Sequence, residues 1–171
     1  MKEKEKLLVY VDTSVFAGKV LLKDEEDKKS SLLIRRISAN KFNNFKFVTS
    51  KFTLVELGEL ISRKKTKNKA KTVLFDIMYN SKLPIFLLNP EDPHKEFKKK
   101  EYFEIDLLIK NFVNTALDFN IPGFDTIHAH TVKTIDQNII AVSKDNHFRR
   151  FNKIKNVSEV LKPSQFLIKY S

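Results

Sequence analysis

The fold is decided by a short stretch near the start of the chain, LLVYVDTS at residues 7–14. Its first five residues are apolar and rich in β-branched side chains, which is typical of a strand buried on both faces. The polar residues Asp12, Thr13 and Ser14 follow at once, and residues of this kind commonly begin a helix. The stretch therefore predicts a buried strand, Leu7–Val11, that ends at Asp12 and leads directly into a helix.

The same alternation of strand and helix continues along the chain. Further strands are predicted at Phe45–Thr49, Leu83–Leu88, Asn138–Ser143 and Asn156–Val160, the last of them short. Apolar residues at helical spacing predict helices over residues 32–37, 52–61 with Ser50 as cap, 73–79, 102–120, and 125–134 with Asp125 as cap. The charged segment Lys23–Lys29 is interpreted as a break before the first of these helices, and the polar segment Pro90–Lys100 as a loop.

Strands that alternate with helices predict an α/β fold. A parallel sheet of about four to five strands would be covered by helices on both faces, in a Rossmann-like three-layer arrangement. A chain of 171 residues with no repeat or linker predicts a single domain, 1–171, with its core at about 7–167. In such sheets, functional sites lie beyond the carboxyl ends of the strands.

The composition excludes several classes of protein. The chain has no Cys, which rules out disulfides and thiolate metal sites. Its three Gly residues are too few and too scattered for a Walker-type phosphate loop or a dinucleotide fingerprint. The formal net charge of +11 favours nucleic acid as partner, although genome composition or adaptation to heat also produces Lys-rich surfaces. Without a membrane-length apolar stretch or a secretion signal, a cytoplasmic location is expected.

Four acidic residues lie where a site is expected. Asp12 follows the first predicted strand and Asp145 the fourth, while Glu56 lies about one turn into a helix and Asp125 begins another. Because parallel strands end at one edge of the sheet, the four carboxylates can converge there. Taken singly, each has a simpler explanation: a helix cap for Asp12 and Asp125, a turn for Asp145, and a solvated helix face for Glu56.

The strings around these acids carry a family resemblance through their order along the chain. They are Val11–Ser14, Thr53–Leu57, Asp125–Ala129 and Ser143–Phe148. From Leu7 to Leu167 the sequence resembles the PIN-domain family of metal-dependent ribonucleases, which includes the toxins of VapBC-type toxin–antitoxin pairs. The resemblance implies catalytic, metal-binding roles for Asp12, Glu56, Asp125 and Asp145, with support from Thr13, Ser14, Ser143 and Asn146. Ser143 stands where many members have Thr, a change that keeps the hydroxyl.

Carboxylates brought together in this way need a cation. Two of them 5 Å apart repel each other by about 3 kcal/mol at an effective dielectric constant of about 20. Oxygen ligands alone favour Mg²⁺ or Mn²⁺, which can activate a water to hydrolyse an RNA phosphodiester. The resemblance implies products with 5′-phosphate and 3′-hydroxyl ends. Whether one or two ions act stays open, as does whether Asp145 binds metal directly or through a water.

Basic residues are candidates for contact with RNA. They are Arg63, Lys64 and Lys65 at the start of a basic run to Lys71, and Arg149 and Arg150 near the end of the chain, the alternative being solvated helix faces. His128 lies one turn into its helix and is interpreted as a partly buried, hydrogen-bonded residue rather than a catalytic one. The resemblance also implies a small antitoxin protein as partner and a homodimer.

Other functions compete with that of a toxin nuclease. A PIN-domain protein of RNA processing or quality control would share the same chemistry. A non-catalytic RNA-binding or scaffold protein would keep the fold without turnover, although the retention of all four acids argues against it. Phosphoryl transfer through an aspartyl intermediate is disfavoured, because Ser14 stands where such phosphatases have a second Asp.

Overall fold

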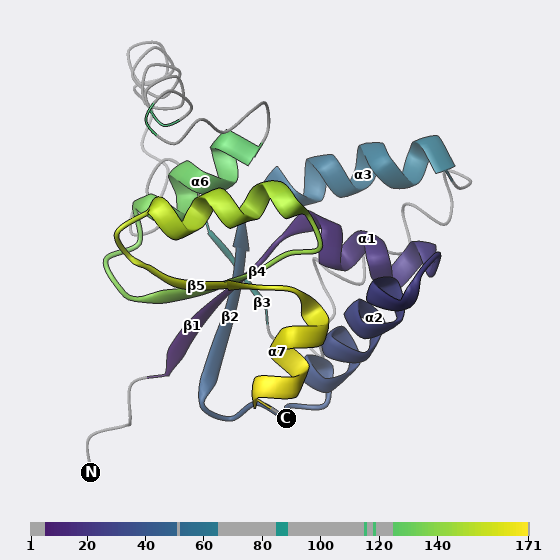
Figure 1. Ribbon diagram of the computed structural model, residues 1–171. Coiled ribbons are helices and arrows are strands. Elements are labelled where there is room, and N and C mark those ends of the chain that lie inside the picture. Colours follow the sequence, from purple (N-terminus) through teal and green to yellow (C-terminus); the bar gives the residue numbers. More distant parts are fainter. Residues whose placement is uncertain are drawn as a thin grey trace.

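A computed structural model of the chain describes residues 6–50, 52–64, 85–88, 115, 118 and 125–170 (Figure 1). Five strands form one sheet in the order β3-β2-β1-β4-β5, and every neighbouring pair is parallel. They are β1 (Leu7–Val11), β2 (Phe45–Ser50), β3 (Ile85–Leu88), β4 (Ile139–Val142) and β5 (Val157–Leu161). The predicted parallel sheet is therefore confirmed, with β1 at its centre.

The central strand β1 is buried on both faces, as its apolar sequence predicts. It pairs with β2 on one side, where Val9 lies opposite Phe47, and with β4 on the other, where Val9 lies opposite Ile140. Its side chains alternate between the faces, so that Val9 and Val11 join one hydrophobic cluster while Leu8 and Tyr10 join another. Burial on both faces is the reason that this strand shows no polar alternation.

Helices cover both faces of the sheet and complete three layers (Figure 1). One face carries the first hydrophobic cluster, which includes side chains from α1 (Thr13–Leu21), α2 (Glu25–Ser38), α3 (Phe52–Lys64) and α7 (Pro163–Tyr170). The other face carries α6 (Asp125–Lys133) and the 3₁₀ helix η1 (Asn146–Lys153), whose Phe148 and Phe151 rings stack with centroids 4.1 Å apart. The predicted three-layer α/β architecture is confirmed. None of the described helices has the length and apolar character needed to cross a membrane.

The charged segment Lys23–Lys29 lies between helices only at its first two residues, so the predicted extent of the break is wrong. Helix α2 begins at Glu25, because the Asp24 carboxylate accepts the backbone N–H of Asp27 at 2.8 Å and caps the helix. The acidic residues of its first turn also lie next to the positive end of the helix dipole. Charges that interrupt an apolar pattern here mark a helix start.

Several predictions fall outside the described residues. They are the helix at Val73–Tyr79, most of the helix at Tyr102–Asn120, the basic run from Lys65 to Lys71, and the loop at Pro90–Lys100. The remaining boundaries shift by one to three residues: β5 is predicted at Asn156–Val160 and found at Val157–Leu161, and the helix predicted over 52–61 extends to Lys64.

Helices α1 and α2 approach each other closely at Gly18. A Cβ atom at this position would lie 2.9 Å from the Cβ of Ser30 and 2.9 Å from Oδ1 of Asp27. Asp27 is 1% exposed, and its other carboxylate oxygen accepts the backbone N–H of Lys23 at 2.6 Å. The glycine therefore permits a packing distance at which any larger residue would push the helices apart.

We expect Gly18→Ala to destabilise the fold by about 2 kcal/mol, because overpacking at a helix contact moves backbone as well as side chains. The free energy of unfolding measured in urea would show the loss. The adjacent Lys19→Ala should change it by less than about 0.5 kcal/mol, as is usual for a surface substitution. Equal stability of the Gly18 variant and the wild type would mean that α1 and α2 do not pack this closely.

Candidate functional site

Five carboxylates line one pocket at the carboxyl edge of the sheet, and four of them come from distant parts of the sequence. The pocket has a volume of about 380 Å³ and is open to solvent. We call it the acidic pocket; it is lined by Asp12, Thr13, Ser14, Glu56, Glu59, Leu60, Arg63, Asp125 and Asp145. The structure thus brings together all four acids that the sequence singles out.

Asp12 extends the hydrogen bonding between β1 and β4 by one residue, and its side chain lines the acidic pocket. Its backbone N–H donates to the carbonyl of Val142 at 3.0 Å, one residue beyond the paired part of β1. Its Oδ2 caps α1 by accepting the Ser14 N–H at 3.0 Å, and it also accepts the hydroxyls of Ser14 at 2.5 Å and Ser143 at 2.8 Å. Within the described residues Oδ1 accepts no hydrogen bond. Asp12 is therefore a helix cap through one oxygen and can bind a ligand through the other.

Glu56, on α3, is also held by hydrogen bonds to one of its two carboxylate oxygens. Helix α3 follows Ser50, whose hydroxyl accepts the Phe52 N–H at 3.2 Å, and Glu56 lies one turn later. Its Oε2 accepts the Thr13 hydroxyl at 2.5 Å and the Nε2 proton of His128 at 2.7 Å. Oε1 accepts no hydrogen bond from the described residues. One oxygen of Glu56 is again fixed by the protein, and the other stays available to the pocket.

His128 links Glu56 to the core. Its side chain is 1% exposed, and its Nδ1 lies 2.5 Å from the buried Tyr10 hydroxyl. Since Glu56 can only accept, Nε2 must carry a proton, and Nδ1 then accepts from Tyr10 when the ring is neutral. Burial acts against a charged ring, but the hydrogen bond to Glu56 and the nearby carboxylates prevail, so the pKa of His128 is raised. The buried, hydrogen-bonded histidine is as predicted, whereas its bond to Glu56 is not visible in the sequence.

Mutual repulsion of the acids is concentrated on Asp125, the first residue of α6. Burial, followed by the charges of Asp12 and Asp145, raises the pKa of Asp125 to about 6. Glu56 behaves in the opposite way, because the hydrogen bonds from His128 and Thr13 outweigh its burial and lower its pKa. Asp125 is therefore the acid that gains most from a cation in the acidic pocket.

Asp145 and Ser143 belong to the turn that follows β4. Oδ1 of Asp145 caps η1 by accepting the His147 N–H at 2.9 Å. The Ser143 hydroxyl donates to Asp12 and accepts the Asp145 N–H at 2.9 Å. Serine therefore makes the bonds that hold the two acids in place, and the methyl group of a threonine is not needed for them.

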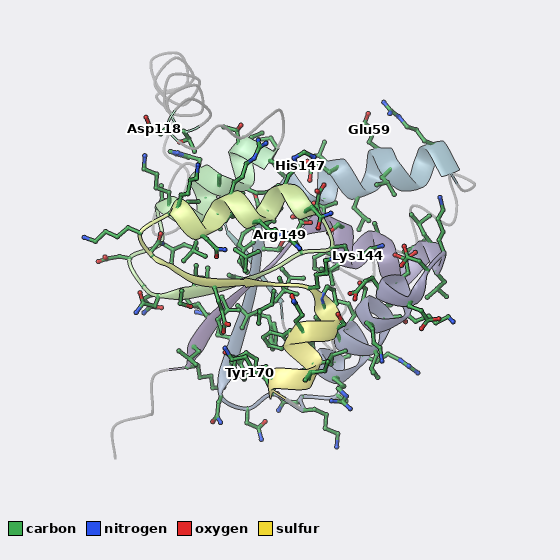
Figure 2. All side chains as sticks on the ribbon, in the orientation of Figure 1. Glu59, Asp118, Lys144, His147, Arg149 and Tyr170 are labelled. Atoms are coloured by element: carbon green, nitrogen blue, oxygen red, sulfur yellow. The ribbon has the colours of Figure 1, made fainter. Side chains whose placement is uncertain are left out.

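Lys144 is a structural contributor that the sequence patterns do not reveal. Its backbone N–H donates to the Ser14 hydroxyl at 2.9 Å, and its side chain forms an ion pair with the buried Asp27 of α2. The turn that carries Ser143 and Asp145 is in this way tied to the helix layer (Figure 2). No residue spacing points to this pair, since its members lie 117 positions apart.

The remaining predicted residues are less closely involved. Asn146 is exposed at the start of η1 and makes no side-chain hydrogen bond within the described residues. Arg63 lines the acidic pocket and pairs with Glu59 one turn earlier on α3. Arg149 and Arg150 lie on η1, outside the pocket lining. Lys65 and the side chain of Lys64 lie outside the described residues.

The donor set fits a hard divalent cation by its chemistry. All four acids offer carboxylate oxygens, and Asp12, Glu56 and Asp145 each keep one oxygen without a hydrogen bond from the described residues. As the side chains stand, however, no group of three His, Asp or Glu in the described part of the chain is arranged to hold a metal ion. Binding of a metal ion would therefore need small side-chain movements. The raised pKa of Asp125 favours such a movement, because a nearby cation would stabilise its ionised form.

Comparison with known proteins identifies the fold. A scan of the sequence against models of protein families finds no match, and a search of curated proteins finds none either. Among solved structures, the chain is similar to one chain in the crystal structure of VapBC2 from Rickettsia felis bound to a DNA fragment from their promoter. The TM-score is 0.56 at 12% identity, over 91% of this chain and 98% of that chain. At this identity the similarity shows the fold, which is PIN-like.

We expect Asp125→Asn to stabilise the fold near neutral pH when divalent ions are chelated. A pKa raised to about 6 means that the stabilising proton is bound at low pH and lost as the pH rises through that value. Allowing for solvent screening of a partly buried group, the gain should be about 1 kcal/mol near pH 7.5 and should vanish near pH 4.

Thermal unfolding at the two pH values checks this expectation. Asp136→Asn, at an exposed acid outside the acidic pocket, serves as the matched control and should show no gain. A stability gain of the Asp125 variant that is independent of pH would contradict the electrostatic explanation.

Proposed function

We propose that this protein is a metal-dependent endoribonuclease that hydrolyses RNA phosphodiester bonds with a metal-activated water. The observation that carries the proposal is the convergence of Asp12, Glu56, Asp125 and Asp145, from four separate segments, on one pocket at the carboxyl edge of a PIN-like sheet. Carboxylates at this density are costly for a fold, as the raised pKa of Asp125 illustrates. A pocket that only binds an anion would not be built from them.

Each acid has a distinct part in the proposed reaction. Asp12 and Asp125 are assigned as the principal ligands of Mg²⁺ or Mn²⁺, with Glu56 beside them and Asp145 in contact with the ion or with a water on it. A bound ion of this kind lowers the pKa of a water and neutralises charge that develops on the phosphate. Thr13, Ser14 and Ser143 orient the carboxylates through the hydrogen bonds described above. Water attacks the phosphorus, the bond between phosphorus and the 3′-oxygen breaks, and the 3′-oxygen takes up a proton, which yields 5′-phosphate and 3′-hydroxyl ends.

The biological setting that we propose is a toxin–antitoxin pair. The similar crystal structure is a VapBC2 complex on promoter DNA, and from it we infer an antitoxin protein as partner. From the resemblance of the sequence to the PIN-domain toxins we also propose that this antitoxin is small and that the protein forms a homodimer, with a cytoplasmic location. The net charge of +11 supports RNA as substrate. A short reading frame that abuts this one upstream would support the toxin assignment, and its absence would favour a role in RNA processing.

A non-catalytic RNA-binding domain is the second candidate. It is favoured by one observation, that no ready three-ligand metal cluster exists among the described residues. Mn²⁺ titration by calorimetry separates the two candidates. RNA binding without measurable Mn²⁺ affinity would support the non-catalytic candidate over the nuclease.

Asp12→Asn is expected to lower the rate of RNA cleavage by at least about a hundred-fold, because it removes charge from the site where the cation would bind. Asparagine caps a helix as well as aspartate, so the thermal unfolding midpoint should stay close to that of the wild type. Cleavage of end-labelled RNA in Mg²⁺, in Mn²⁺ and in chelator measures the effect. The control is Glu25→Gln, at an exposed acid of α2 outside the acidic pocket. Cleavage that survives both chelation and the Asp12 substitution would refute the assignment.

A further inference from the structure

A second cavity, larger than the acidic pocket, opens at the opposite edge of the sheet. Its volume is about 900 Å³. It lies where β1, β4 and β5 begin, since its lining includes Leu7, Asn138 and Asn156. The proposed nuclease chemistry makes no use of this cavity.

The lining is basic around an apolar floor. Lys6, Lys133, Lys153 and Lys155 contribute to it from three separate parts of the chain, against one acid, Asp136. We call this feature the lysine cavity. Leu7, which is 50% exposed, and the buried Ile135 and Ile154 supply apolar surface. A cavity with this lining suits a ligand that carries both negative charge and flat apolar groups.

The cavity is built on fixed backbone. The Asn156 side-chain amide donates to the carbonyls of Val132 and Ile135, at 2.6 Å each, and so joins the end of α6 to the start of β5. The carbonyl of Asn156 in turn accepts the Ile139 N–H at 2.8 Å, at the start of β4. The lysines therefore lie around a junction at which hydrogen bonds hold α6, β4 and β5 together.

Helix η1 connects the lysine cavity to the acidic pocket. It starts after Asp145, at the carboxyl edge, and ends at Lys153, at the amino edge; with eight residues it spans about 16 Å. Phe148 and Phe151 are buried beneath it, whereas His147 and Arg149 are exposed. Figure 2 shows both exposed side chains on this helix, beyond Lys144. Between the two sites, η1 thus exposes one arginine and one histidine.

We propose that the lysine cavity binds the backbone of a single-stranded RNA that extends along η1 from the acidic pocket. The inference rests on the proposed function, because it takes the nuclease substrate as the ligand. Lysines bind phosphates regardless of sequence, and the exposed side chain of Leu7 gives an unstacked base an apolar contact. A single strand fits better than an acidic protein, since its backbone can extend along η1 to a pocket suited to phosphodiester chemistry.

The test measures binding and not cleavage. A fluorescent single-stranded RNA of about 12 nucleotides, a length within the site sizes of single-strand binders, is titrated with protein in chelator and followed by anisotropy. The variant is Lys153→Gln with Lys155→Gln. The matched control is Lys28→Gln with Lys29→Gln, which removes the same charge from the exposed side of α2, on the opposite face of the sheet.

Loss of two phosphate contacts should weaken binding on the order of ten- to thirty-fold at 0.1 M salt. The slope of log K against log salt concentration should become shallower by about 1.4, or about 0.7 for each contact. The control variant should keep the wild-type affinity and slope. Wild-type affinity and slope in the lysine cavity variant would overturn the inference.

The outcomes separate this inference from the proposed function. If the wild type fails to cut RNA but the lysine cavity variant still loses affinity, the nuclease proposal fails and the inference stands. If cleavage depends on Asp12 but the cavity variant binds RNA like the wild type, the inference fails alone. Polyglutamate of equal charge is added as a competitor: displacement of RNA as efficient as that by unlabelled RNA would assign the cavity to an acidic protein and overturn the proposal.

Discussion

The parallel pairing of β1 with β4 is the constraint on which the rest of the structure depends. It sets Val11 opposite Val142 and continues through the Asp12 N–H to the Val142 carbonyl, so that Asp12 and the turn after β4 leave the sheet side by side. The crowded carboxylates are stabilised by hydrogen bonds that the protein donates to one oxygen of Asp12 and one of Glu56. Ser14 and Ser143 donate to Asp12, and Thr13 and His128 donate to Glu56. Burial and the charges of Asp12 and Asp145 together raise the pKa of Asp125.

The sequence predicts those features of the fold and of the site that depend on patterns among residues close together in the chain. The apolar run Leu7–Val11 predicts the central strand because a strand buried on both faces has no polar positions. The rule that sites lie beyond the carboxyl ends of parallel strands predicts that the acids meet. The sequence does not predict the start of α2 correctly, because a run of charged residues is also typical of a loop. In the structure, Asp24 and the acids after it stabilise the backbone of the first turn.

What the sequence does not reveal are contacts between side chains remote from each other along the chain. His128 lies 72 positions from Glu56 and 118 from Tyr10, and Lys144 lies 117 from Asp27. The local sequence around each of these residues predicts nothing unusual: His128 is a histidine in a helix, Tyr10 a tyrosine in the core and Lys144 a lysine exposed to solvent. Their partnership follows from the strand order β3-β2-β1-β4-β5, which no local spacing encodes. The same strand order sends the chain back along η1, so that carboxylates gather at one edge of the sheet and lysines at the other.

The bond between Ser143 and Asp12 spans 131 positions, and this has a consequence for the order of events during translation. The ribosome delivers β1, α1, α2 and β2 long before β4, so one edge of β1 stays unpaired while most of the polypeptide is still being made. A nascent chain therefore lacks the turn that completes the carboxylate cluster. The growing protein cannot present its full set of acids to the messenger RNA that encodes it until that turn has emerged.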